Sequence, residues 1–114
     1  MKLKDQVVSV ELAKRLKGFG IKQRSCFYYF KEQAMNQFEL SDSRYHNSEI
    51  YSAFTVAELG EMLPVGFHSG KSGVGKPWIC KARRKVGVFS VGDTEAEARA
   101  KMLIHLIEKG IVKP

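Results

Sequence analysis

Segment 70–77, GKSGVGKP, is the one stretch whose residue types and spacing approach a phosphate-binding motif. P-loops follow G-x-x-x-x-G-K-[ST], which Gly70, Gly75 and Lys76 match. Pro77 stands where the motif needs a hydroxyl for magnesium, and its nitrogen donates no hydrogen bond. A P-loop also needs a strand before it and a helix after it, whereas this sequence predicts a helix before the loop and a strand after it. We therefore expect no nucleotide cofactor here.

Cysteines and histidines are the other candidates for chemistry. His46, His68 and His105 are scattered, and neither H-x-x-x-H, H-E-x-x-H nor C-x-x-C spacing occurs, so we expect no metal site. Cys26 and Cys80 both fall in apolar segments, which predicts two reduced, buried thiols. The alternatives are a single disulfide between these cysteines, or a cysteine paired with His68 as a nucleophile, and no spacing favours either. We expect a protein that is not an enzyme and uses no cofactor.

Positive charge is concentrated in two segments of this chain, whose net charge is +7. Residues 1–24 carry +5, and residues 71–85 contain no acidic residue but six basic ones: Lys71, Lys76, Lys81, Arg83, Arg84 and Lys85. Such asymmetry favours a polyanionic partner, and basic side chains on a loop and strand can contact backbone phosphates without recognising sequence. The alternative is a solvated surface on which lysines of an edge strand prevent aggregation. The sequence favours both equally.

An aromatic run, Phe27 to Phe30, places two rings on each face of its predicted strand. We favour partial burial of both faces, because aromatic side chains are common in cores. If one face is exposed, it forms a stacking platform for single-stranded nucleic acid. Alternatively, Phe27 and Tyr29 contact a protein partner.

Local signals predict three helices. Ser9 is an N-cap for the first, which Gly18 or Gly20 ends in a left-handed conformation. Thr55 and Glu58 have the spacing of a capping box, which begins a helix of about two turns before a proline.

The third helix has the strongest pattern. Thr94 and Glu97 repeat the capping-box spacing, and Glu97 can pair with Lys101. His105 falls on the solvent side of this helix. The predicted core side is an apolar stripe of Ala96, Ala100, Leu103, Ile104 and Ile107.

Two antiparallel strand pairs are predicted between the helices: SCFYYFKE with QFELSDSR, and PWICKAR with VGVFSV. In PWICKAR, Trp78, Cys80 and Ala82 alternate with a basic side of Ile79, Lys81 and Arg83. Segments 45–49 and 64–76 are predicted loops, the second the most mobile. The order α-β-β-α-β-β-α predicts an α+β fold, a two-layer sandwich with a mainly antiparallel sheet, in a single domain over residues 1–114.

Hydropathy points away from membranes. No apolar run approaches the roughly 18 residues of a spanning helix, and the first residues lack the apolar core of an export signal. We therefore expect a cytoplasmic protein with no membrane partner.

Three stretches carry a resemblance: SVELAKRLKGFGIKQ, YSAFTVAELGEMLP and DTEAEARAKMLIHLIEKGIV. They resemble blocks of small uncharacterised proteins encoded in bacterial genomes, prophages and phages, and cover about half of the chain. The resemblance implies a compact intracellular protein. It supplies no activity and no catalytic residues, and does not include GKSGVGKP.

Weaker likenesses involve shorter segments. VGDTEAEA is similar to the start of the final helix of HicB-like antitoxins, and ELAKRLKGFGIKQ resembles the first helix and turn of a helix-turn-helix, although the next residues favour a strand. Double-stranded RNA binding domains share a strand-to-helix ending, but need a basic helix start where this chain has Glu95 and Glu97.

The sequence thus supports two hypotheses. The first is a small accessory protein that binds nucleic acid weakly, without sequence specificity, through the basic loop and hairpin. The alternative is a phage- or host-related protein-protein interaction module that uses the aromatic hairpin.

Overall fold

The computed structural model describes residues 2–44, 49–71, 73–83 and 87–114. These residues form three α-helices: α1 (Val10–Gly18), α2 (Val56–Met62) and α3 (Glu95–Glu108), with a short 3-10 helix, η1 (Leu3–Asp5), before them. One antiparallel sheet, in the order β2-β1-β3, contains β1 (Tyr28–Lys31), β2 (Glu39–Ser41) and β3 (Glu49–Ser52). A second, in the order β4-β5-β6, contains β4 (Phe67–Lys71), β5 (Trp78–Ala82) and β6 (Phe89–Gly92). The predicted α+β class with antiparallel strands is confirmed.

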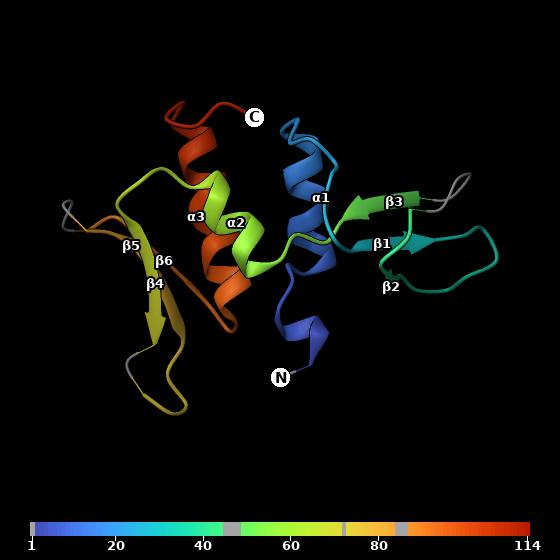
Figure 1. Cartoon of the computed structure of the whole chain (residues 1–114), viewed down its shortest axis with the longest axis horizontal. Coiled ribbons are helices and arrows are strands. Elements are labelled where there is room, and N and C mark those ends of the chain that lie inside the picture. Colours follow the sequence, from blue (N-terminus) through green and yellow to red (C-terminus); the bar gives the residue numbers. More distant parts are fainter. Residues whose placement is uncertain (1, 45–48, 72, 84–86) are drawn as a thin grey trace.

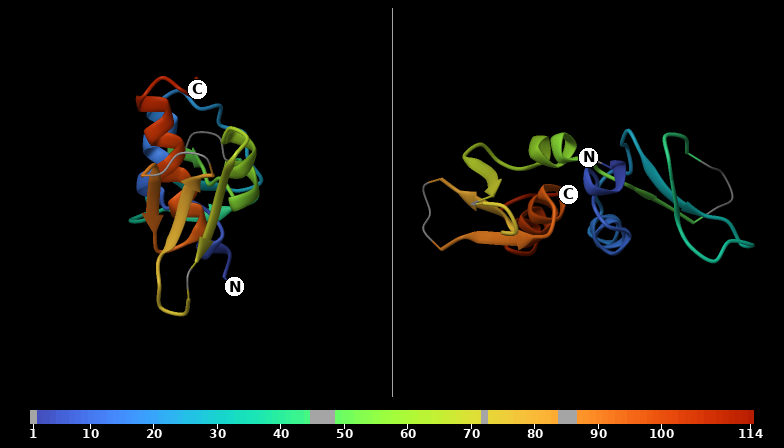
Figure 2. Two further views of the ribbon diagram at one scale, coloured as in Figure 1. Left: turned by 90° about the vertical axis from the view of Figure 1, so that its left-hand side faces the viewer. Right: turned by 90° about the horizontal axis from the view of Figure 1, so that it is seen from below.

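The elements are stacked side by side in an elongated molecule of 47 × 34 × 19 Å (Figure 1). The β4-β5-β6 sheet comes first, followed by α3 with α2, then α1, then the β1-β2-β3 sheet, and the view from below shows the same order (Figure 2). Helix α3 packs on the β4-β5-β6 sheet and also on α1 and α2, so it joins the two halves. None of the described helices is long and apolar enough to cross a membrane.

Apolar burial on two sides explains the central position of α3. The predicted stripe lies in the main core with residues of α1 and α2, and all its members are buried except Ile107, which is partly buried. A second stripe, which the sequence analysis missed, packs with Cys80 against the β4-β5-β6 sheet: Ala98, Met102 and Leu106. A helix between two layers needs two apolar faces.

Most predicted helix ends are confirmed. The Ser9 hydroxyl accepts a hydrogen bond from the Leu12 N–H at 3.3 Å, and Thr55 and Glu58 form both bonds of a capping box. Gly20, at φ +93°, follows the end of α1 in the left-handed region that favours glycine.

The cap of α3 differs from the prediction. The Thr94 hydroxyl accepts from the Glu97 N–H, but the Glu97 carboxylate accepts from the Ser9 N–H of α1 at 2.8 Å. Glu97 forms no ion pair with Lys101, whose Nζ donates to the Val91 carbonyl instead. The physical reason is that Ser9, at the start of α1, has a partly buried amide that needs an acceptor.

Each half has a strand that was not predicted, so the observed order is α-β-β-β-α-β-β-β-α. Residues 45–48 of the first predicted loop lie outside the described residues, and Glu49 begins β3. The second predicted loop, 64–76, contains β4. Its sequence FHSGK has little intrinsic strand preference, but every residue pairs with β5 and Ser69 bonds to α3. Tertiary contacts therefore create this strand.

The two free cysteines differ in environment. Cys80 is fully buried, as predicted, and burial raises the pKa of its thiol to about 11. The prediction of a buried thiol is wrong for Cys26, which is exposed because it precedes β1 instead of lying within it.

Replacing Glu97 with alanine should destabilise the fold by removing the acceptor of the Ser9 N–H. Hydrogen bonds to charged groups contribute about 1.5–3 kcal/mol, and both residues are partly solvated, so we expect a loss of about 1–2 kcal/mol in the free energy of unfolding. Urea denaturation monitored by the fluorescence of Trp78, the single tryptophan, measures it. Glu97→Gln, which keeps an acceptor oxygen, should recover most of the loss.

Glu108→Ala is the matched control on the same helix. Its contact with Arg15 spans 3.9 Å between side chains that are each 52% exposed, and such pairs contribute about 0–1 kcal/mol. Equal losses from Glu97→Ala and Glu108→Ala would contradict the role assigned to Glu97.

Cysteine reactivity should separate the two thiols. A thiol reagent at neutral pH should modify Cys26 rapidly and Cys80 only after unfolding, because Cys80 is buried and protonated. We expect one fast-reacting thiol in the native protein, two in denaturant, and none in native Cys26→Ser. Rapid modification of both native thiols would show that the β4-β5-β6 sheet does not pack on α3 as described.

Candidate functional site

The candidate site is the side of the β4-β5-β6 sheet that faces away from α3, here called the outer face. Strand register places residues in two rows across the sheet. His68 pairs with Lys81, which pairs with Phe89, and Gly70 pairs with Ile79, which pairs with Val91. The alternate residues point to α3, so these rows face outward.

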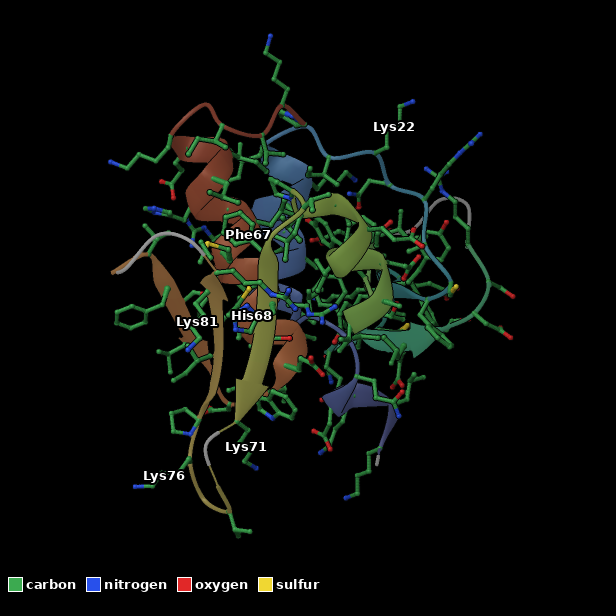
Figure 3. The ribbon with its side chains drawn as sticks, turned by 60° about the vertical axis from the view of Figure 1, so that its left-hand side comes forward. Lys22, Phe67, His68, Lys71, Lys76 and Lys81 are labelled. Carbon is green, nitrogen blue, oxygen red and sulfur yellow. The ribbon has the colours of Figure 1, made fainter. Side chains whose placement is uncertain are left out.

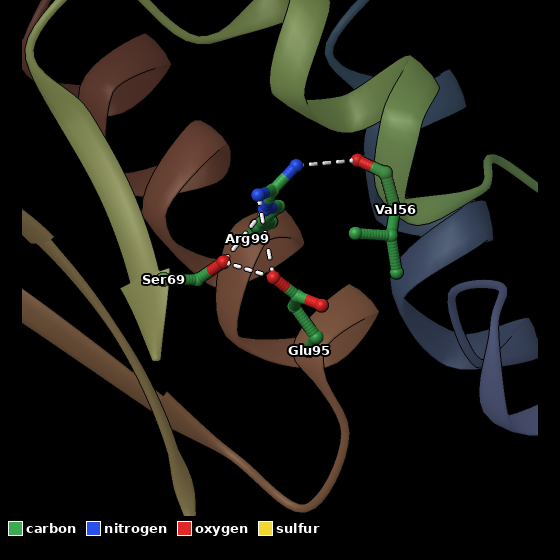
Figure 4. Close-up of polar contacts among 4 residues, drawn as sticks. All are labelled: Val56, Ser69, Glu95 and Arg99. Carbon is green, nitrogen blue, oxygen red and sulfur yellow. Dashed lines mark hydrogen bonds and ion pairs between the residues drawn. The ribbon is translucent and has the colours of Figure 1, made fainter. Parts of the chain in front are cut away.

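The opposite side of the sheet is fastened to the helices by Arg99 of α3 (Figure 4). Its Nε donates to the Ser69 hydroxyl of β4 at 2.9 Å, and its guanidinium also donates to the Val56 carbonyl of α2 at 2.8 Å. Glu95 accepts from Ser69 at 2.5 Å and pairs with Arg99 at 3.3 Å. Since β4 is tied to both α2 and α3, the orientation of the outer face is fixed.

Strand β6 is held equally closely, and this contact decides which residues face outward. The Ser90 hydroxyl donates to the Ala98 carbonyl at 2.6 Å. A Cβ atom on Gly92 would lie 2.6 Å from the Ala98 nitrogen, so only glycine fits there. Phe89 and Val91 must then face outward, and they are 62% and 37% exposed.

Two of the predicted basic residues lie on this face, and two more lie at the end of the β4-β5 hairpin. Lys81 and Arg83 are exposed, which confirms the basic side predicted for this strand, and Cys80 on the other side is buried. Lys71 and Lys76 are exposed at the tip of the β4-β5 hairpin (Figure 3). The other two basic residues predicted for the site, Arg84 and Lys85, lie outside the described residues.

These cations are not neutralised locally. Residues 62–92, which include the whole sheet, contain no aspartate or glutamate. Within the described part of the chain, the ion pairs join Arg15 to Glu108 and Arg99 to Glu95, and neither involves the site. The outer face therefore carries uncompensated positive charge.

The alternative explanation for these lysines is that they protect the edge of a sheet from aggregation, and the strand order tests it. Strand β5 lies between β4 and β6, so Lys81 is on the central strand and guards no edge. Lys71 ends the edge strand β4, and edge protection remains an explanation for it alone.

The first two residues of GKSGVGKP, Gly70 and Lys71, end β4, and residues 73–77 lie between β4 and β5. The Lys76 N–H donates to the Gly73 carbonyl at 3.1 Å, and Gly75 has φ +75°. A strand precedes this loop where we expected a helix, and a strand follows it as expected. Its amides therefore do not continue into the helix start on which a P-loop depends.

The histidines and thiols do not converge in the described residues. Cys80 pairs with Ser69 and faces α3, whereas His68 pairs with Lys81 and faces outward, so the considered nucleophile pair is separated by the sheet. His105 is exposed on α3 as predicted, and His46 lies outside the described residues. No group of three or more metal-ligating side chains occurs in the part of the chain that the structure describes.

The aromatic run is partly buried along its length, as we favoured. Tyr29 packs against the main core, and its hydroxyl donates to the Val8 carbonyl at 2.7 Å. Burial, and then the charge of Glu97, raise the pKa of this phenol to about 12. Phe27 is also partly buried, so neither ring stands free as a contact surface.

Phe89 was missed by the sequence analysis. A usable signal was present in FSVG, residues 89–92, where large apolar residues alternate with serine and glycine. The sequence analysis assigned no faces to this strand, and the close approach of α3 directs Ser90 and Gly92 inward and Phe89 outward.

Comparisons with known proteins returned no match, whether to family models, to curated proteins or to solved structures. The resemblance to phage-encoded proteins stays a prediction.

Proposed function

We propose that this protein is a small non-enzymatic accessory protein of the cytoplasm that binds nucleic acid weakly and without sequence specificity. Its contacts are the outer face of the β4-β5-β6 sheet and the β4-β5 loop. The observation that carries the proposal is the uncompensated positive charge there, since Lys71, Lys76, Lys81 and Arg83 are exposed on a sheet without acidic residues.

The spacing of the cations suits a polyanionic strand. Lys76 lies at the hairpin tip and Arg83 lies just beyond β5. An extended protein chain rises about 3.3 Å per residue, so these two cations are about 23 Å apart along the chain. Charges spread over this length can neutralise several consecutive phosphates, and the flexible stems of lysine and arginine adapt to any sequence. Arg84 and Lys85 extend the basic segment in the sequence.

The protein-interaction alternative gains no comparable support. It relied on Phe27 and Tyr29, and Tyr29 is engaged by the core and by Val8. Replacing Tyr29 would therefore disturb folding before it tested any partner.

Charge reversal on the outer face tests the proposal. In the wild type, about four phosphate contacts should give a slope of about −3 to −4 for log affinity against log salt concentration. The double variant Lys81→Glu, Arg83→Glu should reduce the magnitude of the slope by about two and weaken binding about tenfold or more at low salt. Fluorescence anisotropy with labelled DNA and RNA measures both quantities.

The matched control is Lys22→Glu, Arg24→Glu. Both residues are exposed, and Lys22 lies well away from Lys81 (Figure 3). Either double variant lowers the net charge from +7 to +3, so a difference between them reports location and not total charge. Equal weakening by both variants, or no binding by the wild type at low salt, would refute the proposal.

A further inference from the structure

We propose that the outer face selects single-stranded nucleic acid, with a base stacked on Phe89 and the adjoining phosphates on Lys81 and Arg83. This inference rests on the proposed function and adds the class of nucleic acid. It begins from an apolar side chain in an unusual place: the Phe89 ring is 62% exposed on the surface of a sheet.

Contacts between β6 and α3 fix which residues of β6 face outward. Antiparallel sheets with one solvated face usually place apolar residues inward and polar residues outward. Here Ser90 and Gly92 face α3, while Phe89 and Val91 face solvent. A slip of one residue would put Phe89 where Ser90 bonds to the Ala98 carbonyl. It would also put Val91 in the place of Gly92, where a Cβ atom would lie 2.6 Å from the Ala98 nitrogen.

A positive charge lies beside the Phe89 ring, on Lys81. Lys81 is its direct cross-strand partner, and His68 is the next residue across the sheet. Cross-strand partners on one face have Cβ atoms about 5 Å apart, so a group lying on the ring is within reach of the lysine. A hollow of about 530 Å³ adjoins them, lined in part by Phe89, Lys81, Arg83 and Ile79.

An exposed aromatic ring beside cationic side chains suits single-stranded nucleic acid better than a duplex. Bases in a duplex are stacked on one another, whereas an unpaired base offers its face to an aromatic ring and its phosphates to nearby cations. A protein partner is the other occupant that an apolar surface suggests. The cationic, acid-free surroundings favour a polyanion over it.

The test measures the affinity of the wild type for labelled oligothymidylate and for a duplex of the same length, at low and high salt, with Phe89→Ala, Phe89→Leu and Phe89→Trp. We expect the wild type to prefer the single strand. Phe89→Ala and Phe89→Leu should both lose roughly five- to hundredfold in single-strand affinity, since stacking on an aromatic ring is lost in either case. Phe89→Trp should restore it.

Two readouts separate stacking from charge and from folding. The salt slope should be unchanged in the Phe89 variants, because no phosphate contact is removed. Trp78, on the side of β5 that packs toward α3, reports by its fluorescence whether the alanine and leucine variants keep their fold, which we expect because the Phe89 ring is mostly in solvent.

The outcomes distinguish the two proposals. If single strand and duplex bind equally, or if Phe89→Ala binds oligothymidylate as tightly as the wild type, the inference about Phe89 is wrong and nucleic-acid binding stands. A leucine variant that keeps full affinity also overturns it, because apolar contact then suffices. If neither nucleic acid binds at low salt, both proposals fail.

Discussion

The guanidinium of Arg99 is the interaction on which the arrangement of the outer sheet depends. It joins three elements far apart in sequence: the Val56 carbonyl at the start of α2, Ser69 on β4, and Glu95 one turn earlier on α3. Only about a fifth of the Arg99 side chain and a quarter of that of Glu95 are exposed. Partial burial makes these charge-assisted bonds count for more than a surface ion pair, and it makes the loss of one partner costly. Gly60 completes the arrangement, because a side chain there would occupy the place of the guanidinium.

The acidic residues at the start of α3 are engaged in contacts within the fold. Glu95 binds Arg99 and Ser69, and Glu97 binds the amide of Ser9 on α1. Both carboxylates also lie at the positive end of the helix dipole. Glu95 and Glu97 therefore serve as structural partners on the side of the sheet that faces the helices, away from the cations of the outer face. One helix thus connects the two halves and leaves the opposite side of the sheet electropositive.

Features that depend on neighbouring residues could be predicted from the sequence, and those that depend on distant partners could not. Ser9, Thr55 and Thr94 were identified as caps because a cap is a bond between a side chain and the backbone three residues on. Strand β4 was missed because FHSGK has little strand preference of its own. It forms a strand because it pairs with β5 and because Arg99 donates a hydrogen bond to Ser69. At the candidate site, alternation correctly placed Lys81 opposite Cys80. Phe89 was assigned no role, since only the contact of Gly92 with α3 shows which way it faces.

An exposed aromatic ring on a sheet is ordinarily a liability for solubility, and its surroundings show how it is tolerated. Lys81, beside the ring, places a charge on the central strand, where it protects no edge. On the edge strand β6, the Val91 carbonyl accepts a hydrogen bond from Lys101 of α3. Apolar surface is thus kept on the outer face while β6 is partly covered. A protein that needed only solubility would place a polar residue at position 89, since nothing in the packing of β6 requires a large outward side chain. The packing of the fold therefore does not explain Phe89, and the proposed stacking of a base on its ring accounts for it.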